Sequence, residues 1–137
     1  MRIMLDEGAI CPTYAHDDDA GMDLYTPCDV DIYPKGSVTI DTGVHVQIPH
    51  GMFGKLESKS GLNVNRSIVS LGGVIDSGYT GSIRVKLYNL GKFTHTFHAG
   101  DKIVQMIVQP CKRETFDIVD SLDSTDRGDN GFGSTGR

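Results

Sequence analysis

Tryptophan is absent from the 137-residue sequence, and cysteine occurs only three times, at Cys11, Cys28 and Cys111. The cysteines lie far apart and form no Cys-x-x-Cys pair, which argues against a zinc ribbon. An odd number of cysteines in a reducing compartment predicts three free thiols, at least some of them buried. No surrounding pattern marks any of the three as a catalytic nucleophile.

Long apolar runs are also missing. The sequence contains no stretch of about 18 apolar residues, so a membrane-spanning helix is not predicted. Residues 1–6 lack the apolar core of a signal peptide. We therefore expect a soluble, cytoplasmic protein (in the host cytoplasm if the gene is viral), and the length suits one domain.

Positive charge is in deficit, because 13 Lys and Arg residues against 18 Asp and Glu residues give a net charge of −5. Such a chain does not attract a polyanion over long range, so nucleic acid is not an expected partner. An anionic substrate would need local donors and a metal ion. The charge balance thus favours a small anion in a focused site.

Helical periodicity is weak, and alternation with a period of two dominates. Apolar and polar side chains alternate in residues 82–89 and 44–48, as in strands with one buried face. Residues 102–109 are more continuously apolar, and residues 30–40 suggest two more strands around a turn. At most a short helical turn fits near residues 58–63. Many short strands between turns predict an all-β sandwich or barrel.

Five segments carry side chains suited to nucleotide chemistry. In residues 19–24, small residues precede the carboxylate of Asp23. Residues 55–62 combine Lys59, the Ser60 hydroxyl and backbone N–H groups near Gly61, all donors for phosphate oxygens. Taken singly, each segment has an ordinary explanation, namely a solvated loop or a chance Lys-Ser-Gly sequence.

The third segment, residues 72–81, begins with paired glycines that permit a tight hairpin and close approach of a flat ligand. Asp76 in this segment is placed to act as a general base on water, and Tyr79 offers a ring face. The fourth segment, residues 100–107, contains Gln105 in an apolar strand, where a polar side chain needs a partner.

The fifth segment lies in residues 120–137, which are rich in Asp, Ser and Gly and predict a mobile tail. Arg127 can bind phosphate through two parallel hydrogen bonds. Phe132 can stack on a base, while Ser134 and Thr135 offer hydroxyl groups.

In this order and spacing, the five segments resemble the five motifs of the trimeric dUTP pyrophosphatases (dUTPases), over residues 19–136. The resemblance implies a jelly-roll-like β domain (residues 1–119), a C-terminal arm (residues 120–137) and a homotrimer. Active sites would lie between subunits, with each arm closing over a neighbour's site. The implied reaction is hydrolysis of dUTP to dUMP and pyrophosphate, which limits uracil incorporation into DNA and supplies dUMP for dTTP synthesis.

The resemblance also implies residue roles. Asp76 would activate the attacking water, and Tyr79 would exclude a 2′-hydroxyl. Asp23 would contact Mg²⁺ through water. The remaining roles are binding of the uracil edge, the phosphates and the stacked base, and they fall to Lys59, Ser60, Gly61, Ser70, Gly73, Val74, Ile75, Arg84, Gln105, Arg127, Phe132, Gly133, Ser134 and Thr135.

The sequence departs from the family pattern at several positions. Lys59 and Lys102 stand where Arg is usual, which replaces a planar fork with a point charge. Ser70 stands where many relatives have Asn, and Gly78 and Thr80 replace the commoner Asp and Arg. These changes bear on affinity and base discrimination, because the water-activating carboxylate and the arm are intact.

Three alternatives remain at this stage. A dCTP deaminase shares the fold and would need a glutamate in the base pocket, for which Glu57 and Glu114 are the nearest candidates. A binding or regulatory protein on the same scaffold would recognise a protein partner as well as nucleotide. A structural β-sandwich would bind no nucleotide.

Overall fold

The computed structural model describes residues 1–131, which form ten strands and one short helix. The elements are β1 (Arg2–Leu5), β2 (Met22–Tyr25), β3 (Val30–Ile32), β4 (Ser37–Gln47), β5 (Met52–Glu57), α1 (Ser60–Arg66), β6 (Ile68–Leu71), β7 (Val74–Asp76), β8 (Ser82–Asn89), β9 (His95–Phe97) and β10 (Lys102–Pro110). The predicted all-β fold is therefore confirmed.

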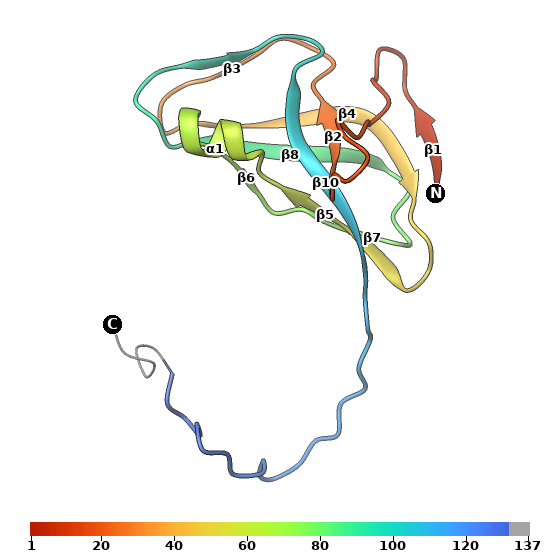
Figure 1. Cartoon of the computed structure of the whole chain (residues 1–137), viewed down its shortest axis with the longest axis vertical. Coiled ribbons are helices and arrows are strands. Elements are labelled where there is room, and N and C mark those ends of the chain that lie inside the picture. Colours follow the sequence, from red (N-terminus) through yellow and green to blue (C-terminus); the bar gives the residue numbers. More distant parts are fainter. Residues whose placement is uncertain (132–137) are drawn as a thin grey trace.

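The strands form two four-stranded antiparallel sheets and a smaller two-stranded one. The first sheet has the order β1-β4-β8-β6, the second has the order β2-β10-β5-β7, and β3 pairs with β9. Apolar side chains from both large sheets make one core; Val44 and Val85 come from the first sheet, and Leu24 and Met106 from the second. This arrangement is a β-sandwich, and Figure 1 shows the strands that build it.

Alternation in the sequence predicted the buried faces correctly. In β8, Ile83, Val85 and Leu87 are almost fully buried, while the intervening Arg84 and Lys86 are exposed. Successive side chains of a strand point to opposite faces, so the apolar set packs into the core. The pairing of β3 with β9, and not with β4, is a long-range contact that local turn signals do not encode.

The expected hairpin at Gly72 and Gly73 does not form. The chain instead crosses between the large sheets, because β6 pairs with β8 whereas β7 pairs with β5. Both glycines have positive φ, +77° and +128°, a backbone conformation that L side chains rarely adopt. A Cβ at Gly73 would lie 2.6 Å from the Cβ of Leu56, so glycine permits the close crossing.

All three cysteines are free and exposed, so the expectation that some thiols are buried was wrong. Cys11 and Cys28 lie in surface loops, and Cys111 follows the last strand, where no core surrounds it. No helix within residues 1–131 is long and apolar enough to cross a membrane.

Residues 111–131 contain no helix or strand. Figure 1 shows this segment leaving the sheets after β10 and running away from them. Several of its apolar side chains are highly exposed, including Phe116, Ile118 and Leu122 at 90%, 102% and 88%. A boundary between domain and arm at residue 119 stays a prediction.

Candidate functional site

Residues from three of the predicted segments meet around the carboxylate of Asp23. Asp23 lies opposite Gln105 in the β2–β10 pair. The Lys59 ammonium, just before α1, donates to Asp23 Oδ1, and Lys102 Nζ lies 2.7 Å from Asp23 Oδ2. This cluster of Asp23, Lys59, Lys102 and Gln105 is called the lysine cluster below.

Asp23 is not a solvated loop residue, since it is only 2% exposed. Burial is the largest single influence on its pKa and raises it. Hydrogen bonds and charge from Lys102 and Lys59 outweigh burial, so the pKa of Asp23 lies below its usual value. The carboxylate is therefore ionised and neutralises two cations while no substrate competes for them.

Lys102 is the member of the lysine cluster that the sequence did not nominate as a site residue. Simple alternation would place Lys102 and Gln105 on opposite faces of β10, because they are three residues apart. The register of the β2–β10 pair shifts between Lys102 and Val104, as it does where a β-bulge inserts one extra residue into a strand. Such a residue changes the direction of the side chains on one side of the bulge. A bulge of this kind leaves no clear mark in a single sequence.

The start of α1 lies next to the lysine cluster. Asn63 N–H donates to the Lys59 carbonyl at 2.9 Å, which closes the first turn of the helix. The N–H groups of Ser60 and Gly61 precede this bond and have no partner within the helix. Ser60 and Gly61 are both exposed, so a hydroxyl and backbone donors are available beside Lys59.

Asp76, the predicted general base, ends β7 and is exposed, whereas the preceding Ile75 is buried. The Asp76 carbonyl accepts the N–H of Tyr79 at 3.0 Å, which forms the turn after the strand. Asp76 lines a pocket of about 590 Å³ together with His50, Cys111 and Arg113. Sequence reasoning did not nominate His50 or Arg113.

One chain does not bring Asp76 together with the lysine cluster. Asp76 pairs with Phe53 of β5, whereas Gln105 pairs with Glu57, four residues further along the same strand. Strands rise ~3.3 Å per residue, so the two positions are separated by about 13 Å along β5. They also lie on opposite neighbours of β5, which adds about 10 Å across the sheet.

The residues expected to read the base lie along the crossing between the sheets. Ser70 N–H donates to Ser58 Oγ at 2.8 Å, and the Gly73 carbonyl accepts from Leu56 N–H at 2.8 Å. Val74 is 66% exposed although it is apolar. The crossing is thus held at Ser70 and at Gly73, and it presents an apolar side chain directly after the second contact.

Tyr79 lies in the turn after β7, and Arg84 lies in β8. Tyr79 Oη donates to the Ser82 carbonyl at 2.9 Å, which fixes the ring, and the side chain is 43% exposed. Arg84 Nε lies 3.3 Å from Asp41 Oδ2. The substrate roles expected for both residues stay predictions.

In the arm, Arg127 Nε donates to the Asn130 carbonyl at 3.1 Å. Phe132, Gly133, Ser134 and Thr135 lie outside the described residues. Among residues 1–131, no group of three or more His, Cys, Asp or Glu side chains is placed to hold a metal ion.

Comparison with known proteins agrees with the resemblance seen in the sequence. The dUTPase family model matches residues 7–136. The chain is 43% identical to a deoxyuridine 5′-triphosphate nucleotidohydrolase of Mycolicibacterium gilvum, covering 98% of this chain and 92% of the relative. It is 38% identical to the enzyme of the same name from Anaplasma marginale, with 99% and 95% covered.

Solved structures show the same fold. The dUTPase of Staphylococcus bacteriophage 80alpha with dUPNHPP has a TM-score of 0.89 at 28% identity, covering 99% of this chain and 98% of that chain. A mutant dUTPase of phage phi11 of S. aureus, described with a structural Mg(II) ion, has a TM-score of 0.83 at 26% identity, with 88% and 97% covered. With its β-sandwich and with Asp23, Lys59, Asp76 and Gln105 in the expected segments, the chain belongs to the dUTPase family.

Proposed function

We propose that the chain is a dUTP diphosphatase in which Asp76 takes the proton from the attacking water. The water oxygen bonds to the α-phosphorus, and the bond from that phosphorus to the bridging oxygen of the β-phosphate breaks. The products are dUMP and pyrophosphate. Relatives covering nearly the full length, at 38–43% identity, support the activity.

The lysine cluster is the observation that carries this proposal. Asp23, Lys59, Lys102 and Gln105 come from three distant segments and meet at one end of a sheet. A bound triphosphate would replace the Asp23 carboxylate as the partner of the two lysines and would offer them several phosphate oxygens. Local donors of this kind suit a chain that is otherwise acidic. Ser60 and Gly61 add neutral donors at the same place.

The donor set also fits Mg²⁺ bound with the substrate. Magnesium keeps several waters and is commonly bound through one or two carboxylates plus substrate phosphates. Asp23 is one such carboxylate, and its oxygens are engaged by lysines, so it would face the water shell of the ion and not the ion itself. Magnesium would supply charge neutralisation to the polyphosphate.

Recognition of the nucleoside falls to the crossing segment and the turn after β7. Backbone groups from Ser70 to Ile75, including Gly73 and Val74, would contact the uracil edge. Tyr79, held by Ser82, would pack on the deoxyribose and exclude a 2′-hydroxyl. Arg84 would approach the substrate after leaving Asp41.

The separation between Asp76 and the lysine cluster supports sites shared between copies of the chain. A general base must lie within hydrogen-bond reach of the water that it activates. We therefore assign Asp76 of one copy and the lysine cluster of another to the same site in a homotrimer. The arm, residues 120–137, would add Arg127, Gly133, Ser134 and Thr135 at the γ-phosphate and Phe132 over the base.

The test is pyrophosphate release with Mg²⁺ from dUTP, dCTP, dTTP and UTP, with ammonia measured in parallel. Rapid release from dUTP alone is the expected result. Ammonia from dCTP would instead make the protein a deaminase on the same fold, and release from none of the four would leave a binding protein. Any of these last results overturns the proposal.

A further inference from the structure

A second pocket, which shares no lining residue with the pocket that contains Asp76, lies between the end of α1 and the loop that joins β8 to β9. It has a volume of about 410 Å³. All of its ionisable lining residues are basic, namely Arg66, Lys92 and His95, and no Asp or Glu lines it. The whole chain has a net charge of −5, so a pocket whose ionisable lining residues are all basic is a local exception.

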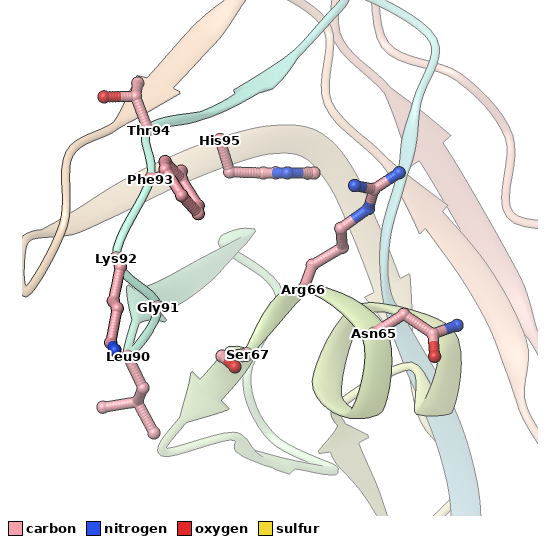
Figure 2. A pocket seen from close by; sticks show the side chains of 9 residues that line it. All are labelled: Asn65, Arg66, Ser67, Leu90, Gly91, Lys92, Phe93, Thr94 and His95. Atoms are coloured by element: carbon pink, nitrogen blue, oxygen red, sulfur yellow. The ribbon is translucent and has the colours of Figure 1, made fainter.

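Two of its basic side chains face each other. Figure 2 shows the side chains of Arg66, from the end of α1, and His95, from β9, pointing toward one another. Within residues 1–131, Arg66 and Lys92 make no ion pair. Burial and the charge of Arg66 lower the pKa of His95, and the smaller effect of Asp101 opposes them.

An anion placed between Arg66 and His95 would offset the effect of the Arg66 charge and favour the protonated form of His95. The Arg66 guanidinium offers a planar fork of N–H donors, which matches phosphate, and a protonated His95 adds charged donors. Ser67 contributes a hydroxyl to the lining. A phosphate monoester, which carries between one and two negative charges near neutral pH, suits these groups better than a carboxylate, which carries one.

An aromatic side chain completes the pocket. Phe93 is 84% exposed and lies beside His95 in Figure 2. An exposed ring beside basic groups can stack on the base of a nucleotide, because every base has a π-face.

We propose that this pocket is a second site that binds a small phosphate-bearing molecule, with its phosphate on Arg66 and His95, Lys92 at the rim and Phe93 under any attached base. The shared chemistry is a phosphate group, and its source is either free pyrophosphate or a nucleoside monophosphate. Nothing in the proposed reaction uses these residues, so the site is additional to the hydrolytic one.

The experiment is an NMR titration of the full chain. The proposed active site is first saturated with Mg²⁺ and a non-hydrolysable imido analogue of dUTP. Pyrophosphate, dUMP and deoxyuridine are then added separately while the His95 ring signals are followed; a H95Q variant assigns them. We expect pyrophosphate and dUMP to shift the signals saturably and to raise the pKa of His95, and deoxyuridine to do neither.

Variants test the assignment. Arg66→Gln should weaken binding by about tenfold or more, since it removes a charged hydrogen-bonding group, and Lys92→Gln should weaken it less. Lys86→Gln, an exposed site on β8 outside the pocket, is the matched control and should bind like the parent. A stronger response to dUMP that is lost in Phe93→Ala would identify a nucleotide as the ligand.

Two outcomes overturn the proposal. His95 signals that do not respond to any phosphate would show that the pocket is an ordinary solvated surface. A response that persists in Arg66→Gln, with only a lower melting temperature, would show that Arg66 merely stabilises the end of α1. Pyrophosphate release from dUTP is measured separately on the same protein, so failure of the hydrolytic assignment is recognised independently.

Discussion

At the scale of single residues, we expect Lys59 and Lys102 to have two alternative partners, the buried carboxylate of Asp23 and a substrate phosphate. In the structure Asp23 neutralises Lys59 and Lys102, and each lysine is also a cation that a triphosphate would attract. An Arg at either position would hold Asp23 or a phosphate through a rigid fork, whereas Lys is a flexible point charge. The lysines therefore favour exchange of partners over tight retention of either one.

Asp76 provides the most direct test of the chemistry. Replacement by Asn should leave nucleotide binding intact but reduce turnover by about 10²–10⁴-fold, because the amide cannot accept the proton of water. Pyrophosphate release and calorimetric binding of the imido analogue would measure the two effects. Turnover close to that of the parent would remove Asp76 from the role of base.

Gly73 tests the crossing between the sheets. Gly73→Ala should lower the free energy of unfolding by about 1–3 kcal/mol or more, because it adds backbone strain and a clash with Leu56. Gly72→Ala is the matched control, since its φ is also positive but nothing lies within 4 Å of its Cβ. Denaturant unfolding of both variants measures the difference, and equal losses would contradict the role of the contact with Leu56.

At this scale, the sequence predicted burial correctly where the alternation within one strand determines which side chains point into the core. Ile83 and Val85 were placed inside correctly by alternation alone. Lys102 was missed because a bulge turns it toward Asp23. The exposure of the cysteines was predicted wrongly, since a general tendency toward burial says little about a residue in a surface loop.

At the scale of elements, His45 joins three parts of the chain. From β4, His45 Nδ1 lies 2.8 Å from the Thr80 carbonyl, in the turn after β7, and Nε2 lies 3.2 Å from Asp6 Oδ2, in the loop after β1. Both partners accept hydrogen bonds, so both contacts are satisfied together only when the imidazole is protonated.

This geometry predicts a pH dependence. The pKa of His45 is raised above 6.5. The largest cause is the hydrogen bond to Thr80; the hydrogen bond to Asp6, the charge of Asp6 and the charge of Asp41 follow. A raised pKa means that the folded state binds the proton more tightly. The stabilisation is therefore complete below pH 6.5 and is lost as pH rises through the higher pKa of the folded state.

His45→Gln should flatten this part of the stability profile, which thermal unfolding between pH 5 and 9 would measure (an interval of ~4 units around the usual His pKa). His98→Gln is a suitable control, because His98 lies 3.4 Å from Asp29 on a different part of the surface. A profile that is unchanged in His45→Gln would contradict the role given to this histidine.

Most elements could be predicted from the sequence, but their partners could not. Periodicity located the strands at residues 44–48, 82–89 and 102–109, and the helix was expected only a few residues early. The sequence predicted a hairpin at Gly72, whereas the chain crosses there from one large sheet to the other. Paired glycines permit either geometry. Which strand pairs with which depends on contacts distant in the chain.

At the scale of the whole molecule, the segment between β10 and the arm pairs with no strand within residues 1–131 of its own chain. Phe116 and Ile118 are apolar and almost fully exposed, and exposed apolar surface of this kind commonly marks an interface. If the chain forms the proposed homotrimer, replacing both with Asp should shift it toward monomers, with a lower sedimentation coefficient. Leu122→Asp alone should shift it less, and an unchanged sedimentation coefficient in the double variant would contradict a role for this segment in assembly.

The end of the arm carries a separate prediction. Deletion of residues 128–137 should cripple turnover and leave the melting temperature and sedimentation coefficient almost unchanged, because every strand of the sandwich lies within residues 2–110. A variant with the same segment replaced by Gly and Ser separates the effect of sequence from that of length. Full activity in either variant would show that the arm is dispensable.

The distance between Asp76 and the lysine cluster along β5 has a genetic consequence. A chain without its Asp76 carboxylate would still contribute phosphate donors, and a chain without Lys59 and Ser60 would still contribute the base. Two alleles that are each inactive would then restore activity when expressed in one cell, since mixed assemblies would contain some complete sites. Such rescue would show that a complete catalytic site requires residues from more than one chain.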